Sequence, residues 1–305
     1  MEDEVLFDSI EDILCRLPVK SVVRFKGVCR RWLSLIKDPK FIKLHQRSTQ
    51  SHTDQGSLVT LKDNQLCSVD LSTLRITKEA INHPLSKLPD RICLEGACNG
   101  LLCLSGGSGD NYRMVLWNMS TKEHKILPPV PDYGLDFGVF ELGGFGYDPC
   151  NDDYKVVRVH YCPRRGNRAM FYSLRLDSWS WGSNYKHEYH NFRQFRFLSW
   201  AGVVYAGGAL NWMARPNNTI VGIDLNTENV RDLRFPSTPH DTFRIDSIGV
   251  LEGKLCVACS KEYWYGPKEV MDIWVMEEYG QVESWTKLFS IRPYITRVGA
   301  TTSIN

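Results

Sequence analysis

The chain has 305 residues, of which 43% are hydrophobic and 24% charged, and its formal net charge is +2. This composition is ordinary for a folded globular protein, and so small a net charge gives no indication of a polyanionic partner. No run of about 18 apolar residues occurs, so we expect no membrane span. The acidic N-terminus lacks the features of a secretory signal. The ten cysteines are therefore expected to be reduced thiols of a cytoplasmic or nuclear protein.

The first 46 residues have the pattern of three to four short helices. Asp8 begins a capping-box-like D-x-x-E, and apolar residues then recur at helical spacing up to Pro18. Gly27 is expected to cap the second helix, and Asp38-Pro39 to begin the last one. So small a bundle cannot bury all of its apolar side chains. The surplus either faces a partner or packs on the rest of the chain, and the pattern alone favours neither.

Residues 47–57 (RSTQSHTDQGS) contain no large apolar side chain and predict a linker. From residue 58 onward, short β-rich runs alternate with Gly, Asn, Asp, Ser and Pro. The Gly-containing pairs Asn99-Gly100, Gly207-Gly208 and Glu252-Gly253 each lie between two such runs. This pattern predicts antiparallel strand pairs.

Five segments of this region resemble one another, each a strand that leads into a short polar turn. The second residue of each segment is Asp70, Asn118, Arg175, Asp224 and Val275, a spacing of 48 to 57 residues. A period near 50 with about four strands per unit is what a β-propeller blade needs. A β-sandwich or an irregular β domain is the alternative.

Two parts of the chain resemble domains of a known protein family. The run LPVKSVVRFKGVCRRW at residues 17–32 resembles the F-box of plant F-box proteins. The runs CNGLLC (98–103), LWNMST (116–121) and GFGYD (144–148) resemble the F-box-associated interaction domain, a kelch-like domain also found in the S-locus F-box-like group. The fold implied is α+β multidomain, with a small three-helix F-box followed by an all-β, propeller-like domain.

The resemblance implies three parts: an F-box (1–46), a linker (47–57) and a substrate-binding β domain (58–305), whose last strand group is complete or truncated. It also implies the substrate-recognition subunit of an SCF-type ubiquitin ligase. In that family the F-box binds a Skp-type adaptor and, through it, a cullin and a RING subunit. The carried-over adaptor-binding residues are Leu6, Ile10, Leu14, Leu17, Pro18, Val22, Val28, Cys29 and Trp32.

Two details of this F-box remain open at this point. Trp32 is as compatible with the helical core as with the interface. Val5-Leu6 stands where the family has Leu-Pro, so one adaptor contact is expected to be weaker.

No catalytic or metal-binding motif was recognised, so we expect a non-catalytic protein without cofactor or metal. Cys256 and Cys259 form a lone C-x-x-C without a second pair and are expected to be structural thiols. The glycine-rich runs 106–109 and 143–146 lack the residues of a phosphate loop and are expected to be turns. His83 is expected to be an ordinary surface or core residue.

The β domain offers weak signals for a substrate contact. The alternating Arg and Phe residues at 191–197 could stack on nucleobases, but a strand with a basic and an apolar face is the plainer interpretation. We expect a protein substrate, and neither nucleic acid nor membrane. Aromatic and Arg side chains are frequent at protein hot spots. The candidates for contact are Arg193, Arg196, Tyr263, Trp264 and Tyr265.

Two other function classes stay open. One is an adaptor-bound scaffold or inhibitor that leads to no ubiquitination. The other is a propeller that binds a small ligand or glycan.

Overall fold

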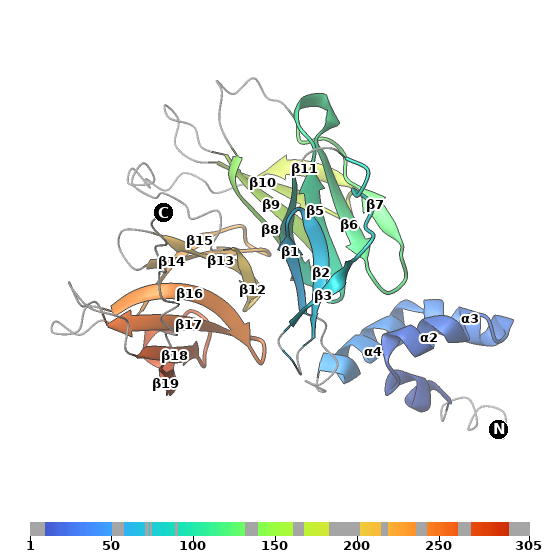
Figure 1. The fold of residues 1–305 in the computed structure, drawn as a ribbon, viewed down its shortest axis with the longest axis horizontal. Helices are drawn as coiled ribbons and strands as arrows, with labels where there is room; N and C mark the ends of the chain where they lie inside the picture. The colour runs from blue at the N-terminus through green and yellow to red at the C-terminus, as the bar shows by residue number, and fades with distance from the viewer. Residues whose placement is uncertain are drawn as a thin grey trace, which may run out of the picture. The chain divides into compact units, whose positions relative to one another are not determined.

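The computed structural model describes the chain at residues 10–50, 58–70, 73, 75–88, 91–131, 140–160, 168–182, 202–214, 219–235, 243–261 and 270–292. The chain divides into two compact units, Met1–Pro129 and Val130–Asn305. The first unit contains the helices and two β-sheets, and the second contains three β-sheets (Figure 1).

The N-terminal helices follow the predicted order. Residues 10–15 are helical, and α2 (Val19–Phe25), α3 (Arg30–Lys37) and α4 (Pro39–Gln50) follow. The side chain of Asp38 accepts a hydrogen bond from the backbone N–H of Lys40 at 2.7 Å, which is the predicted helix start. Because α4 continues to Gln50, the first four residues of the expected linker are helical.

The two sheets of the first unit are antiparallel. Sheet A has the order β1 (Leu58–Lys62), β2 (Gln65–Asp70), β3 (Arg75–Ala80). Sheet B has the order β4 (Ile92–Cys98), β5 (Leu101–Gly106), β6 (Arg113–Asn118), β7 (His124–Ile126), with the 3-10 turn η2 (Gly109–Asn111) before β6. Apolar residues of both sheets share one core, which includes Leu66, Leu104 and Trp117.

The three sheets of the second unit are four-stranded and antiparallel. Sheet C contains β8 (Phe140–Asp148), β9 (Asp153–His160), β10 (Arg168–Ser173) and β11 (Ser178–Trp181). Sheet D contains β12 (Val204–Ala206), β13 (Ala209–Ala214), β14 (Thr219–Asp224) and β15 (Val230–Arg234). Sheet E contains β16 (Phe243–Leu251), β17 (Lys254–Lys261), β18 (Met271–Met276) and β19 (Trp285–Ile291), with the 3-10 turn η4 (Val282–Ser284) before β19.

The predicted repeat lies at corresponding places in the sheets. Asn118 ends β6 and Asp224 ends β14, and each precedes the last strand of its sheet. The Oδ1 atom of Asn118 accepts hydrogen bonds from the backbone N–H groups of Ser120 and Thr121, at 2.9 and 3.0 Å. The Oδ1 atom of Asp224 accepts the equivalent pair, at 3.0 and 2.8 Å. The same side-chain chemistry therefore closes the same hairpin in two sheets.

A second repeated turn joins the first two strands of four sheets. Both of its central residues have positive φ, as in the hairpin turns that match the twist of paired strands. The three predicted pairs adopt it, for example Asn99 (φ 50°) and Gly100 (φ 77°). Asp63-Asn64 in sheet A forms the same turn, which was not predicted because the pair contains no glycine. Asn and Asp tolerate this conformation better than other non-glycine residues.

The predicted turn at residues 143–146 is wrong, because these residues lie inside strand β8. Their glycines serve close packing of sheet C on sheet D. A Cβ atom on Gly146 would lie 2.4 Å from a ring carbon of Tyr205, and one on Gly144 would lie 2.8 Å from a methyl carbon of Leu210. The missing side chains let the two sheets approach each other. The other glycine-rich run, residues 106–109, leads into a turn as expected.

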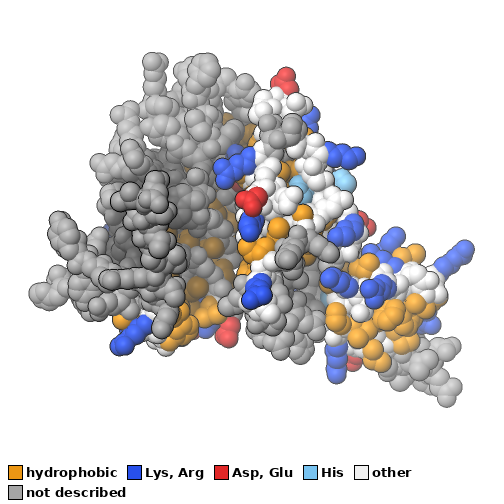
Figure 2. All heavy atoms as spheres, viewed as in Figure 1, with side chains coloured by type: hydrophobic (Ala, Val, Ile, Leu, Met, Phe, Trp, Pro, Cys, Tyr) orange, Lys and Arg blue, Asp and Glu red, His pale blue; other side chains and the backbone are white. Residues whose placement is uncertain are grey.

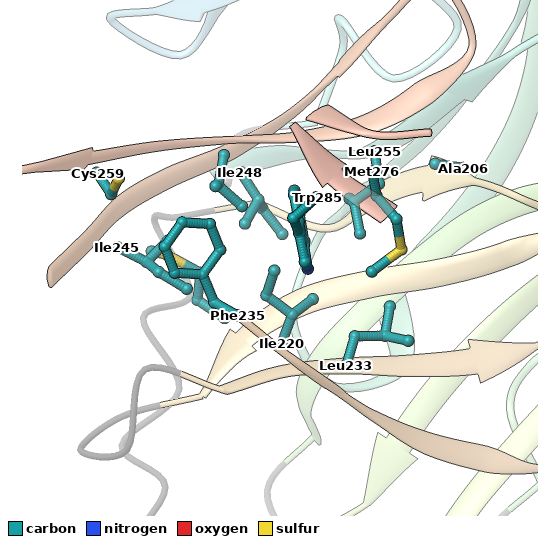
Figure 3. Packing of buried hydrophobic residues seen from close by; sticks show 12 residues of the cluster. Ala206, Ile220, Leu233, Phe235, Ile245, Ile248, Leu255, Cys259, Met276 and Trp285 are labelled. Atoms are coloured by element: carbon teal, nitrogen blue, oxygen red, sulfur yellow. The ribbon is translucent and has the colours of Figure 1, made fainter. Parts of the chain in front are cut away.

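Trp285 joins sheet E to sheet D (Figure 3). Its indole is 6% exposed and packs edge-on against Phe235, with 5.3 Å between the ring centroids. Its Nε1–H donates a hydrogen bond of 3.1 Å to the backbone oxygen of Arg234, at the end of β15. Ile220 and Leu233 of sheet D and Ile248 of sheet E belong to the same core.

A buried ion pair within sheet C also links that sheet to sheet D, through Lys155. Lys155 of β9 lies 3.4 Å from the carboxylate of Asp148 and 3.8 Å from that of Glu228, and its Nζ donates to the backbone oxygen of Leu225 at 2.6 Å. Burial alone would raise the pKa of Asp148. Hydrogen bonds from Asn151 and the charge of Lys155 outweigh burial and hold that pKa below its usual value.

We predict that Trp285→Ala lowers the free energy of unfolding by about 3–5 kcal/mol, because it empties a core position and breaks the bond to Arg234. Chemical denaturation of the full chain measures the change. Phe289→Ala is the control, since Phe289 lies on the same strand but is 50% exposed, and it should cost less than about 1 kcal/mol. Equal losses from both variants would show that Trp285 does not hold the two sheets together.

We predict that Asp148→Asn lowers the free energy of unfolding by about 1–3 kcal/mol at pH 7, because it leaves Lys155 poorly paired. A carboxyl whose folded pKa is depressed stabilises the fold above its unfolded pKa, and this contribution is lost as the pH falls through the folded pKa. The difference from wild type should therefore shrink below about pH 4. The exposed Asp110 provides the control Asp110→Asn, which should have little effect at any pH. A difference that stays constant down to acid pH would contradict the ion-pair account.

Candidate functional site

The N-terminal helices share a small core of their own. Its buried side chains are Leu14, Cys15, Val22, Ile36 and Phe41. His45 of α4 is also buried, and its Nε2 atom lies 2.9 Å from the backbone oxygen of Leu17, which ties the last helix to the end of the first. This core fixes which side chains remain on the surface of the helices.

The same helices expose several apolar side chains. Figure 2 shows hydrophobic side chains gathered over the helices, with Lys and Arg around them. Exposure is 59% for Ile13, 41% for Val19 and 58% for Val28, and 43% for both Ile42 and Leu44. Exposed apolar side chains on so small a bundle indicate a surface that a partner covers.

The structure divides the predicted adaptor-binding residues into three groups. Pro18, Val28 and Cys29 are exposed. Ile10, Leu17 and Trp32 are half-buried and pack against the helical core. Leu6 lies outside the described residues.

Leu14 and Val22 form the third group and require a correction, because they are only 1% and 4% exposed. Both belong to the helical core, so neither can touch a partner unless the bundle opens. Trp32 serves that core at least in part, since its ring packs edge-on against Phe25 with 5.4 Å between centroids. The predicted adaptor-binding residues therefore include exposed residues, which form the surface of the bundle, and core residues, which hold the helices in place beneath it.

Val28 and Cys29 owe their exposure to the connection between α2 and α3. They lie between the two helices, since α2 ends at Phe25 and α3 begins at Arg30. Val28 donates its backbone N–H to Phe25 at 3.1 Å, which closes the turn after α2, and Cys29 is the N-cap of α3. Side chains in such a turn point away from a helical core more readily than side chains inside a helix.

Sequence reasoning missed four exposed apolar residues, namely Ile13, Val19, Ile42 and Leu44. The available signal was the surplus of apolar residues in a bundle too small to bury them all.

The cysteine pair of the β domain lies in strand β17. Cys259 is fully buried, and burial raises its thiol pKa to about 12. Burial also raises the pKa of Cys256. A thiol with a raised pKa is a poor nucleophile and a poor metal ligand. Within the described ranges, no group of three or more His, Cys, Asp or Glu residues is arranged to hold a metal ion.

A cavity of about 420 Å³ lies between the β1–β2 hairpin and the β3–β4 connection, and its lining includes Asp63, His83 and Ser86. His83 is 7% exposed, and burial lowers its pKa. These residue types could in principle act together in catalysis. However, the Ser86 hydroxyl donates to the side chain of Asn82 at 2.9 Å. The geometry shown is not that of an activated serine.

The predicted substrate contacts Arg193, Arg196, Tyr263, Trp264 and Tyr265 lie outside the described residues. They remain predictions. In the part of the chain that the structure describes, no helix is long and apolar enough to cross a membrane.

Comparison with known proteins supports both parts of this architecture. Residues 7–44 match the F-box domain family, and residues 57–303 match the family described as F-box associated beta propeller domain. The chain is 31% identical to F-box protein CPR1 of Arabidopsis thaliana, over 93% of this chain and 72% of that protein. It is 30% identical to an Arabidopsis F-box/kelch-repeat protein, over 93% and 78% of the two chains. Among solved structures, TolB from Agrobacterium tumefaciens aligns over 78% of each chain with a TM-score of 0.44 and 10% identity.

We predict that alkylation of the native chain at about pH 8 modifies the exposed Cys29 and Cys150 and leaves the buried Cys103 and Cys259 unmodified. Mass spectrometry after timed exposure to iodoacetamide identifies the sites. The same reaction in denaturant should modify all four. Rapid native labelling of Cys259 would contradict its buried, high-pKa state.

Proposed function

Because the chain belongs to the plant F-box proteins with an F-box-associated β-propeller domain, we propose that it is the substrate-recognition subunit of an SCF-type ubiquitin ligase. Its F-box binds a Skp-type adaptor, which links it to a cullin and a RING subunit. Its propeller recruits the protein to be ubiquitinated. The sheets of the β domain are the blades of this propeller, and both predicted parts of the fold, helical and all-β, are confirmed.

The observation that carries the proposal is the set of exposed apolar side chains on a helical bundle that already has its own core. Val19 and Val28 have no role in that core, and both lie within the matched F-box. Covering them would release apolar surface from water, at roughly 25 cal/mol per Å². An adaptor with a complementary apolar groove would gain that energy on binding.

The mechanism we infer is one of positioning. The receptor holds a substrate close to a charged ubiquitin carrier and so raises the effective concentration of its lysine side chains. This role needs two binding surfaces and no catalytic group of the receptor itself.

A non-degradative scaffold differs from a substrate receptor in whether its partners are degraded. A non-degradative scaffold or inhibitor would bind the adaptor equally well, but no partner would accumulate when the proteasome is blocked. The two functions are separated by proximity labelling of partners in the native tissue, with and without proteasome inhibition. Partners that increase on inhibition support the receptor, and partners that do not change support the scaffold.

We predict that Val19→Asn/Val28→Asn weakens capture of a Skp-type adaptor by about tenfold or more, because two apolar side chains leave the interface. Affinity is measured with purified adaptor and the full chain. The matched control is Ile126→Asn/Leu176→Asn, which changes two propeller residues that are 58% and 67% exposed. The control should bind like wild type.

A second readout uses the wild-type chain. Bound adaptor should protect Cys29 from alkylation while Cys150, in the propeller, continues to react. Absence of adaptor binding by the wild-type chain would overturn the proposed function.

A further inference from the structure

Three helices of the bundle, α2, α3 and α4, are strongly basic, whereas the preceding helix (residues 10–15) carries Glu11 and Asp12. Residues 19–50 contain nine Lys or Arg and one Asp, whereas the rest of the chain contains 28 Lys or Arg and 34 Asp or Glu. The overall charge of +2 conceals this separation. The nine residues, here called the basic set, are Lys20, Arg24, Lys26, Arg30, Arg31, Lys37, Lys40, Lys43 and Arg47.

The basic set lies on the surface. Eight of its nine side chains are exposed, and Lys26 is half-buried. Lys20, Arg24 and Arg30 form no ion pair with any described residue. The single acidic residue, Asp38, is occupied as the cap of α4. The positive charges of Lys20, Arg24 and Arg30 are therefore not paired with an acidic side chain in the described part of the chain.

Part of the basic set lies where it does not stabilise its own helices. The positive end of a helix dipole is at its N-terminus and favours acidic side chains there. None of α2, α3 and α4 has an acidic residue in its first turn. Arg30 and Arg31 begin α3 instead, and Lys20 and Arg24 place like charges one turn apart on α2. Arg24, Lys37 and Arg47 lie in last turns, where the helix dipole favours positive charge, so local helix stability accounts for these three. It does not account for Lys20, Arg30 and Arg31, which lie in first turns.

The basic residues are neighbours of the apolar side chains that the proposed function uses. Lys20 follows Val19, and Arg30 follows Val28 and Cys29. Figure 2 shows Lys and Arg side chains beside the hydrophobic ones on these helices. A partner that covers Val19 and Val28 must therefore approach the basic set as well.

We propose that the partner surface facing this F-box is acidic, and that attraction between it and the basic set accelerates assembly with the adaptor. This inference rests on the proposed function and adds the chemistry of the partner surface. Charges around an apolar contact act at long range and chiefly raise the association rate. Such steering can raise association rates by about 10- to 1,000-fold, and salt removes it.

A protein surface fits the observations better than a nucleic acid or an anionic membrane. Exposed Val19 and Val28 contribute little to the binding of phosphates, but they fit an apolar groove with an acidic rim. The acidic excess in the rest of the chain would also repel an extended polyanion.

The test measures association of the full chain with purified Skp-type adaptor between about 30 mM and 500 mM NaCl. We expect the association rate to fall by about tenfold or more over this range, with a smaller change in the dissociation rate. Lys20→Glu/Arg24→Glu should slow association by about tenfold or more at low salt. Lys20→Gln/Arg24→Gln should lie between this variant and wild type.

The matched control is Lys62→Glu/Lys87→Glu, which changes two exposed lysines of the β domain by the same total charge. It should associate like wild type. Circular dichroism of each variant checks that the helices remain folded. An equal slowing in the control would overturn the proposal, because net charge rather than the basic set would then govern the rate.

The two proposals fail in different ways. Adaptor binding with a flat salt dependence would overturn the acidic-surface inference and leave the receptor function standing. No adaptor binding at any salt concentration would overturn both. Tight binding of duplex DNA or phosphatidylserine vesicles that is lost in Lys20→Glu/Arg24→Glu, together with a flat salt dependence for the adaptor, would assign the basic set to a polyanion instead.

Discussion

The β domain depends on sheets that bury both of their faces. In sheet D, Leu210 and Trp212 of β13 belong to the core shared with sheet C, whereas Met213 belongs to the core shared with sheet E. Strand β14 repeats the alternation, with Ile220 on one side and Val221 on the other. Successive side chains of a strand point to opposite faces, so such a strand is stable only with a neighbouring sheet on each side.

This constraint explains where the polar groups of the interior lie. Asn211 is fully buried, and its Nδ2 donates to the backbone oxygens of Ala206 and Ala209, while its Oδ1 accepts from the hydroxyl of Tyr279. Lys155 likewise reaches across to sheet D. Buried polar groups are costly unless they are paired, so each of these links is fixed in position and specifies how two sheets meet. The apolar faces stabilise the packing of the sheets, and the polar contacts of Asn211 and Lys155 fix how neighbouring sheets are positioned.

The parts of the fold that could be predicted from the sequence are those with local causes. An Asn or Asp followed by small polar residues closes a turn whatever surrounds it, and Asn118 and Asp224 behave in this way. Gly144 and Gly146 could not be interpreted from sequence alone, because the reason for them lies in Leu210 and Tyr205 of another sheet. A glycine gives the same signal whether it serves a turn or a close approach.

The helical bundle shows the same limit at its surface. Ile13 and Leu14 are adjacent and equally apolar, yet one is 59% exposed and the other 1%. Helical spacing predicted the bundle but not which of two adjacent residues faces its core, since that depends on how the short helices cross. The exposure of charged residues can be predicted more easily than that of apolar residues, because Lys and Arg are almost never fully buried. The basic set could therefore have been located from sequence by counting charge along the chain instead of over the whole chain.

The exposed apolar residues and the basic residues of these helices would act at different distances from a partner. Attraction between charges acts over about 10 Å at 0.1 M salt and assists the encounter, whereas apolar contact acts only once the surfaces meet. A face with few apolar side chains and many positive charges would therefore assemble quickly without needing a large interface. The affinity then depends on a few exposed residues such as Val19 and Val28, and the speed depends on the helices around them.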